Sequence, residues 1–173
     1  MERKEIKNKI EVLFPELDLV FNNDSVDMLE IVVNRNDIIF FMETMKSDPD
    51  LNFSMLSSVT AVDYKTYKSS KKTHRFEAVY HLYSLEKKHR VRVQSYLNDS
   101  KPEIETLSSI WKSANWMERE AYDMYGINYI NHPNMKRVLL WEGYNGHPLR
   151  KEYPLKGNRG EMLKGIIKNN KVK

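Results

Sequence analysis

Apolar residues recur at helical spacing in two early stretches of the chain. Residues 2–14 repeat apolar positions with a helical period, which predicts a helix that Pro15 ends. Residues 34–46 carry a second apolar face, and Asn34 or Asn36 is placed to cap the start of that helix. Each helix would bury one face against a core.

The helical period is lost in the stretches that we interpret as strands. Residues 18–33 favour two short strands joined by a polar turn, and residues 54–64 and 75–85 favour longer ones separated by an exposed polar loop. Residues 90–97 alternate apolar and polar positions throughout. Strands with one apolar and one polar face indicate an antiparallel sheet with one face in the core.

Two further helices are predicted downstream of these strands. A proline opens the first, over residues 102–110. The second covers residues 116–125, where Asn115 is the expected N-cap, Glu118 can complete a capping box and Gly126 ends the helix.

Regular periodicity ends after this last helix. We therefore divide the chain into a scaffold domain over residues 1–126 and an extended, basic arm over residues 127–173, with a short helix expected at Glu161–Ile167. Pro and Gly interrupt the arm repeatedly, yet it is too apolar for a disordered linker. We expect the arm to bury its apolar side chains against its own domain or against a partner.

The composition narrows the classes of protein. The chain has 173 residues and no cysteine. A disulfide scaffold, a thiolate zinc site, an iron–sulfur cluster held by the chain's own ligands and a Cys nucleophile are therefore excluded. The apolar runs are far short of the ~20 residues of a membrane span, so we expect a soluble protein of a reducing compartment.

The charge is concentrated at one end of the chain. The net charge is +4, and residues 134–173 hold ten Lys and Arg against three Asp and Glu. A basic end can meet nucleic acid, anionic lipid or an acidic partner protein, and charge alone does not choose among them.

The densest group of charged residues lies in the last predicted helix. Glu118, Arg119, Glu120 and Asp123 could form a carboxylate metal site or an acid/base pair. The favoured interpretation is structural, with Glu118 in a capping box and Arg119 and Asp123 forming a salt bridge one turn apart.

The histidines allow a similar pair of interpretations. His132 and His147 each precede a proline and could be zinc ligands. Two turns whose imidazoles hydrogen-bond the backbone are favoured, because no third ligand stands at a usable spacing. His74, His81 and His89 are expected on the surface of the sheet.

Basic residues suggest two further hypotheses. Residues 136–137 and 150–152 could bind phosphate, but no glycine-rich phosphate loop stands near them. Arg90, Arg92 and Tyr96 share one face of a strand and could belong to an RNA-recognition sheet. A solvated charged face is the favoured interpretation.

Longer motifs resemble one family. The stretches Trp116–Gly126, 127–139 and Gly146–Pro154 resemble the signature of the C subunit of NADH:quinone oxidoreductase, the 30-kDa-type subunit of respiratory complex I. Ser57–Tyr64 and Arg75–Ser84 are similar to that family too.

This resemblance implies a fold and a role. The fold would be α+β, with helices packed on a mixed, largely antiparallel sheet and an arm that wraps a neighbouring subunit. The chain would be a non-catalytic subunit of the peripheral arm, on the cytoplasmic side of the inner membrane or the matrix side in mitochondria. Its partners would be the large quinone-site subunit and the iron–sulfur subunits, not nucleic acid. FMN, the clusters and quinone would belong to those partners.

The resemblance leaves the electron donor open. The same family occurs in membrane-bound nickel–iron hydrogenases, formate hydrogenlyase and F420H2 dehydrogenases, and a stand-alone nucleic-acid-binding module is the alternative from another class. We expect the arm over 127–155 to be the main partner-binding element, with Trp141 as its anchor. The expected signature and partner-binding residues are Glu118, Arg119, Glu120, Asp123, Gly126, His132, Pro133, Arg137, Trp141, Gly146, His147, Pro148, Arg150, Lys151, Tyr153 and Pro154.

Overall fold

The computed structural model describes residues 2–22, 27–67, 74–157 and 160. The helix expected at Glu161–Ile167 lies outside these residues. The helices are α1 (Arg3–Leu13), α2 (Ile38–Ser47) and α3 (Ala114–Tyr125). The strands are β1 (Val20–Asn22), β2 (Leu29–Val32), β3 (Met55–Asp63), β4 (Phe76–Ser84), β5 (His89–Leu97), β6 (Glu103–Glu105) and β7 (Asn128–Ile130).

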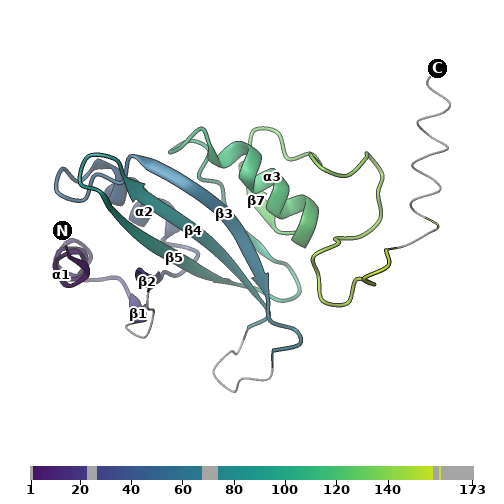
Figure 1. Ribbon diagram of the computed structural model, residues 1–173, viewed down its shortest axis with the longest axis horizontal. Coiled ribbons are helices and arrows are strands. Elements are labelled where there is room, and N and C mark those ends of the chain that lie inside the picture. Colours follow the sequence, from purple (N-terminus) through teal and green to yellow (C-terminus); the bar gives the residue numbers. More distant parts are fainter. Residues whose placement is uncertain (1, 23–26, 68–73, 158–159, 161–173) are drawn as a thin grey trace.

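Five of the strands form one mixed, largely antiparallel sheet, which confirms the expected α+β class (Figure 1). Their order is β1-β2-β5-β4-β3. The β3–β4–β5 meander and the β1–β2 pair are antiparallel, and β2 runs parallel to β5. The chain leaves β2 through α2 and reaches the far edge of the sheet at β3. It then returns strand by strand to β5, which pairs in parallel with β2 in the middle of the sheet.

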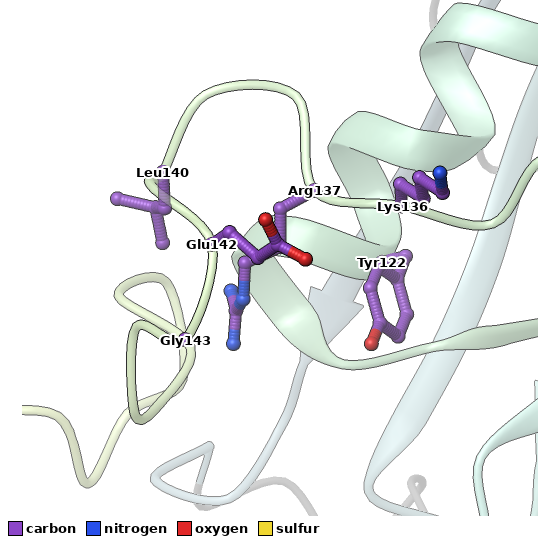
Figure 2. Close-up of a pocket in the computed structure, with 6 residues that line it drawn as sticks. All are labelled: Tyr122, Lys136, Arg137, Leu140, Glu142 and Gly143. Atoms are coloured by element: carbon purple, nitrogen blue, oxygen red, sulfur yellow. The ribbon is translucent and has the colours of Figure 1, made fainter. Parts of the chain in front are cut away.

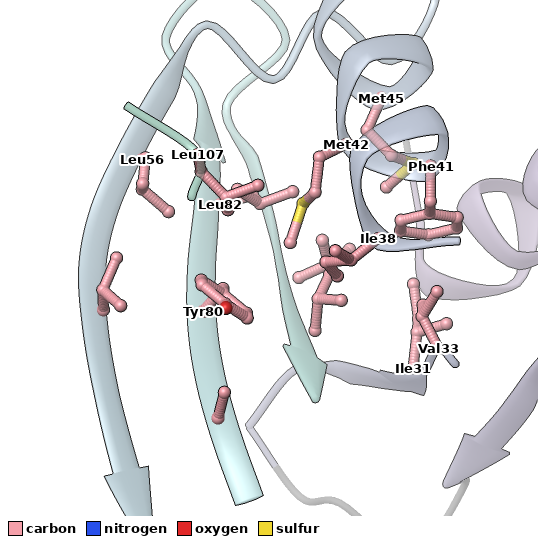
Figure 3. Packing of buried hydrophobic residues seen from close by; sticks show 14 of the residues in the cluster. Ile31, Val33, Ile38, Phe41, Met42, Met45, Leu56, Tyr80, Leu82 and Leu107 are labelled. Carbon is pink, nitrogen blue, oxygen red and sulfur yellow. The ribbon is translucent and has the colours of Figure 1, made fainter. Parts of the chain in front are cut away.

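The helices cover one face of this sheet. The buried apolar residues of α1, α2 and α3 all belong to one core cluster with the inward-facing strand residues. Figure 3 shows Phe41 and Met42 of α2 beside the strand residues Ile31 and Leu82. The alternation predicted over 90–97 is confirmed, because every second residue of β5 is buried.

The helix predicted over 102–110 is wrong. Residues 103–105 form β6, which pairs in parallel with β7 of the predicted arm. The Asn128 N–H donates to the carbonyl of Pro102 at 2.9 Å, and the Thr106 N–H donates to that of Ile130 at 3.0 Å. These long-range bonds override the local signal of a proline at a helix start.

Two local expectations also differ from the structure. The second helix begins at Ile38, because the Asn34 side chain accepts the Asn36 N–H in a turn before the helix and caps nothing. His89 is buried rather than on the sheet surface. Its position is in phase with the core-facing residues of β5, and its Nε2 lies 2.7 Å from the carbonyl oxygen of Leu51.

Candidate functional site: the end of α3 and the arm

The carboxylate of Asp123 binds residues 137–140 of the arm to the end of α3. Its Oδ2 accepts three successive backbone N–H groups, from Val138 at 3.0 Å, Leu139 at 2.8 Å and Leu140 at 2.9 Å. Its Oδ1 accepts a hydrogen bond from Nη1 of Arg137 at 2.5 Å. Four charge-assisted hydrogen bonds thus converge on one buried side chain.

These donors keep Asp123 ionised. Burial by itself would raise the pKa of the carboxyl, but the hydrogen bonds from the Leu140 N–H, the Arg137 guanidinium and the neighbouring N–H groups outweigh it and lower the pKa below its ordinary value of 3.8. The anion is therefore the form that the arm recognises.

Arg137 closes the loop that follows it. Its Nη2 donates to the carbonyls of Tyr144 at 3.0 Å and Gly146 at 3.1 Å. The same guanidinium thus contacts α3 on one side and two turns of the arm on the other. One cation fixes the shape of the whole segment from 137 to 146.

The predicted ion pair between Arg119 and Asp123 is wrong. The Arg119 guanidinium donates instead to the carbonyls of Lys136 at 3.0 Å and Arg137 at 3.2 Å. It also lies over the ring of Trp116, 4.7 Å from its centroid. Arg119 therefore helps to hold the arm rather than the helix.

The last four carbonyls of α3 all accept hydrogen bonds from residues that follow the helix. Such carbonyls have no partner within a helix and carry the negative end of its dipole, so N–H groups and cations stabilise them. The pairs are Tyr122 with the Gly126 N–H (2.8 Å), Asp123 with Nδ1 of His147 (3.0 Å), Met124 with the Leu149 N–H (3.0 Å) and Tyr125 with Nε of Arg150 (2.6 Å).

Gly126 ends α3, as predicted, and the structure adds a second reason for it. Its φ of 74° lies in the left-handed region. A Cβ at this position would also lie 2.5 Å from Nη2 of Arg150 and 2.6 Å from Nε2 of His147. The glycine therefore lets two arm side chains reach the end of the helix.

A second acid, which the sequence analysis did not single out, holds the far part of the arm. Asp63, at the end of β3, accepts a bidentate pair from Arg75, with Nε and Nη2 each 3.0 Å from a carboxylate oxygen, and the backbone N–H of Lys151 at 3.0 Å. Arg75 also pairs with Glu152. The signal was present, because residues 63 and 75 flank the predicted hairpin loop and must come together.

Asp63 and Glu152 share Arg75 as their cationic partner. Burial would raise the pKa of Asp63, but Arg75 and the N–H groups of Lys151 and Lys65 lower it to about 2. The hydrogen bond from Arg75 lowers the pKa of Glu152 to about 2. Both acids are anionic, and both are matched by the same guanidinium.

Glu118 does not form the predicted capping box. It is buried, and its carboxylate accepts the Thr106 hydroxyl at 2.5 Å and the Leu107 N–H at 2.7 Å. Burial raises its pKa to about 7, although these two hydrogen bonds oppose the shift. Glu118 therefore joins α3 to the segment after β6.

Both proline-flanked histidines hydrogen-bond the backbone, as predicted. Nε2 of His132 lies 3.1 Å from the carbonyl oxygen of Asn115, and its Nδ1 accepts the Asn134 N–H at 3.0 Å. His147 bonds the carbonyl of Asp123, as described above. Within the described ranges, no three His, Asp or Glu side chains are grouped so that they could hold a metal ion.

The outer surface of this arm exposes apolar and basic side chains beside the acids Glu142 and Glu152. Leu139, Leu149 and Leu155 are exposed, and so are Lys136 and Lys151. Trp141 is partly exposed and packs edge-on against Tyr144, with 4.7 Å between ring centroids. Exposed leucines beside cations form a surface suited to a partner with apolar and acidic groups.

Two hollows lie along this surface. One, of about 360 Å³, is drawn in Figure 2, where Tyr122 comes from α3 and the other five residues come from the loop between 136 and 143. The other, of about 650 Å³, follows residues 144–157 of the arm. Of the remaining expected site residues, Gly146, Pro148 and Tyr153 are partly buried, whereas Glu120, Pro133 and Pro154 are exposed.

The sheet face that could have bound RNA is occupied by contacts within the chain. Arg92 pairs with Glu30 and Asp27. Tyr96 stacks on His74, with 3.6 Å between ring centroids. These residues do not form the open row of cations and aromatic rings that base stacking requires.

Known proteins similar to this chain point to one family. The family model described as the 30 kDa subunit of respiratory-chain NADH dehydrogenase matches residues 31–159. A C subunit of the NADH-quinone oxidoreductase of Rhizobium etli is 43% identical over 137 residues, which are 79% of this chain and 69% of that protein. The C subunit of the same enzyme from Citrifermentans bemidjiense is 42% identical over 137 residues, 79% of this chain and 81% of that protein.

Solved structures agree with this likeness. A trypsin-resistant fragment (1–134) of Nqo5 superposes with a TM-score of 0.66 and 27% identity, over 78% of this chain and 99% of the fragment. A polypeptide of an archaeal membrane-bound sulfane sulfur reductase has a TM-score of 0.70 over 95% of this chain and 91% of its own length, and its 23% identity shows the fold alone. No helix in the described part of the chain is long and apolar enough to cross a bilayer. The chain belongs to the family of the 30 kDa subunit of respiratory-chain NADH dehydrogenase.

Proposed function

We propose that this chain is a structural subunit of the peripheral arm of a proton-translocating NADH:quinone oxidoreductase, on the cytoplasmic side of the membrane. It supports the large quinone-site subunit and its iron–sulfur neighbours while electrons pass from NADH to quinone. It supplies no catalytic residue, and FMN, the clusters and quinone are bound by its partners. The names of its relatives and the absence of cysteine support this role.

The observation that carries the proposal is the binding of the arm to α3 through Asp123. The acid and Arg137 give the arm a fixed shape while its leucines stay exposed. A surface that is already ordered loses little conformational entropy when it binds. The arm is therefore built to dock on another subunit.

The fold by itself leaves room for a related complex. The archaeal sulfane sulfur reductase contains the same fold in a respiratory membrane complex. The equivalent subunit of a membrane-bound hydrogenase, formate hydrogenlyase or F420H2 dehydrogenase is thus the alternative. NADH is favoured as donor because the relatives at about 40% identity are NADH-quinone oxidoreductase subunits.

The test is capture of the quinone-site subunit by the tagged full-length chain after co-expression. Leu139→Glu and Leu149→Glu change exposed side chains. Both leucines bond to α3 only through their backbone N–H groups, which the substitutions retain. Each should lower the amount captured by about tenfold or more, because a buried unpaired charge at an interface costs several kcal/mol.

Val12→Glu is the matched control, since Val12 is an exposed apolar residue on α1. It should leave capture unchanged. Undiminished capture by both leucine variants would show that the arm is not the binding surface.

A further inference from the structure

Another hollow lies on the face of the sheet opposite the helices. It has a volume of about 480 Å³ and is lined by residues from β3, β4 and β5. It begins at Met55, the first residue of β3, whereas the arm is held at Asp63, the last residue of that strand. The hollow and the arm therefore lie at opposite ends of β3 and can be occupied at the same time.

Apolar side chains form most of the lining of this hollow. Met28, Met55 and Tyr83 line it, and Met55 is 42% exposed. A bulge interrupts the pairing of β3 with β4 between Leu56 and Ser58, beside Met55. Bulges redirect side chains and bend a strand, and Met55, Ser57 and Ser58 around this one all line the hollow.

The guanidinium of Arg90, which lines the hollow, lacks an acceptor within the described part of the chain. Arg90, opposite Tyr83 in the sheet, is exposed, and its guanidinium has no hydrogen-bond or ion-pair partner among the described residues. Arg92, two residues along the same face, is matched by Glu30 and Asp27. The two arginines therefore differ in charge balance. Described acids neutralise the charge of Arg92, whereas no described acid neutralises that of Arg90.

His81 adds a second donor. Its Nε2 accepts a hydrogen bond from Nε of Arg92 at 3.0 Å, so the neutral ring carries its proton on Nδ1. This Nδ1 is buried and has no partner among the described residues. An oxygen that enters the hollow can accept from it once neighbouring side chains adjust. Unsatisfied donors of this kind favour an incoming acceptor.

We propose that this hollow docks a segment of a partner subunit that places an Asp or Glu carboxylate on Arg90 and an apolar side chain against Met55 and Tyr83. The proposal rests on the membership of the chain in a multi-subunit assembly, but not on the arm. A nucleic acid would need several uncompensated cations in a row, and the hollow offers one. The chemistry therefore fits an acidic peptide segment.

Photo-cross-linking in the assembled complex tests this inference. The photoreactive amino acid p-benzoylphenylalanine replaces Met55 in the tagged full-length chain, which is co-expressed with the other subunits of the complex and irradiated. Cross-linking to a partner peptide that contains Asp or Glu is expected. Adding Arg90→Glu should lower the cross-link yield about tenfold, and Arg90→Lys should lower it much less.

Two controls separate this result from folding and from the proposed function. The same photoreactive residue at Val12, exposed on α1, should give no comparable cross-link. The melting temperature of the purified Arg90→Glu chain should match the wild type, because Arg90 makes no ion pair with a described residue. Copurification of the chain with its assembly is scored separately.

The outcomes are distinct. A chain that assembles but shows no Met55 cross-link above the Val12 level overturns this inference and leaves the proposed function standing. Cross-linking to a second copy of the chain, or an unchanged yield in Arg90→Glu, overturns it as well. A chain that fails to assemble at all contradicts both proposals.

Discussion

Asp123, in the last turn of α3, and Arg137, in the arm, form an ion pair whose acid has no exposed side-chain surface. An acid at the C-terminal end of a helix is disfavoured by the helix dipole, so Asp123 does not stabilise α3 by itself. Its carboxylate becomes favourable only when Arg137 and three N–H groups of the arm surround it. Helix end and arm are therefore stable only together.

Replacing Asp123 should loosen the arm and destabilise the chain. Asp123→Asn removes the charge that Arg137 and the N–H groups recognise, and leaves the guanidinium without its anion. Breaking such a buried pair costs about 3 kcal/mol. Thermal or urea unfolding of the purified chain measures this loss. Glu120→Gln, on the exposed side of the same helix, is the control and should change the free energy of unfolding by less than about 0.5 kcal/mol.

Glu118 should make the stability fall as the pH rises. Its pKa is about 7 in the folded chain and 4.5 in the unfolded chain, so the folded state binds the proton more tightly. This contribution is complete below pH 4.5 and is lost as the pH rises through 7. By linkage the loss reaches at most roughly 3 kcal/mol above about pH 8.

The variant Glu118→Gln isolates this effect. The amide oxygen can accept the Leu107 N–H and the amide nitrogen can donate to Thr106, without ionising. The variant should therefore be more stable than the wild type at about pH 8.5 and similar to it at about pH 5, whereas the exposed control Glu43→Gln should follow the wild type at both. A wild-type chain with the same free energy of unfolding at both pH values would contradict the assignment.

His132 does not compensate Glu118. Its Nε2 lies 3.9 Å from the carboxylate, but both ring nitrogens are engaged with the backbone, and burial lowers its pKa. The imidazole is thus neutral where Glu118 titrates. The buried hydroxyls of Tyr80 and Tyr129 also remain neutral, because burial and the charge on Glu118 raise their pKa values.

Local sequence patterns predicted most of the elements but not the contacts of the site. Alternation found β4 and β5, β-branched residues found β3, and a capping pattern with a terminal glycine found α3. The partner of Asp123 was missed because Arg119, one turn away, satisfied the local rule, whereas the true partner lies 14 residues along the chain. Local rules rank near neighbours first, and only the folded arm brings Arg137 to the helix end.

Two other errors have the same origin. Glu118 stands three residues after Asn115, and this spacing matches a capping box. The local pattern does not reveal that the Glu118 side chain is buried and bound by the Thr106 hydroxyl. Residues 103–105 became a strand because β7 pairs with them. By contrast, Asp63 and Arg75 could have been predicted, since an antiparallel hairpin places its two ends side by side.

The contact between Asp63 and Lys151 should protect the arm from proteolysis. Asp63→Asn weakens the bidentate pair with Arg75 and the bond to the Lys151 N–H. Trypsin cleaves after Arg150 and Lys151, so cleavage there should speed up by about tenfold as the segment opens more often. Mass spectrometry of timed digests reads out the site. Asp50→Asn, which removes an exposed pair with Lys9, should leave the rate unchanged.

The same acids set the behaviour of the arm at low pH. The pKa values of Asp63 and Glu152 are lowered to about 2 in the folded chain, so their contributions are present above their ordinary values of about 4 and are lost as the pH falls toward 2. Arm release below about pH 4 should therefore appear in the wild type as faster hydrogen exchange of the Lys151 N–H relative to core amides. An exchange ratio independent of pH from about 6 to about 3 would argue against this contact.

Two glycines separate the cost of a left-handed backbone from the cost of filling the helix end. Gly126 and Gly143 have φ values of 74° and 82°, so alanine is strained at both, by about 1 kcal/mol. Of the two, only Gly126 would bring the new Cβ against neighbours, which are the side chains of Arg150 and His147, whereas the space around Gly143 is open.

Gly126→Ala should therefore destabilise the chain by about 2 kcal/mol more than Gly143→Ala, because it also displaces the two side chains that bind the carbonyls of Tyr125 and Asp123. Urea unfolding of both variants measures the difference, and capture of the quinone-site subunit should fall with Gly126→Ala alone. Equal losses in the two variants would mean that Arg150 and His147 can bind the helix end from another position, and that the glycine serves only the turn.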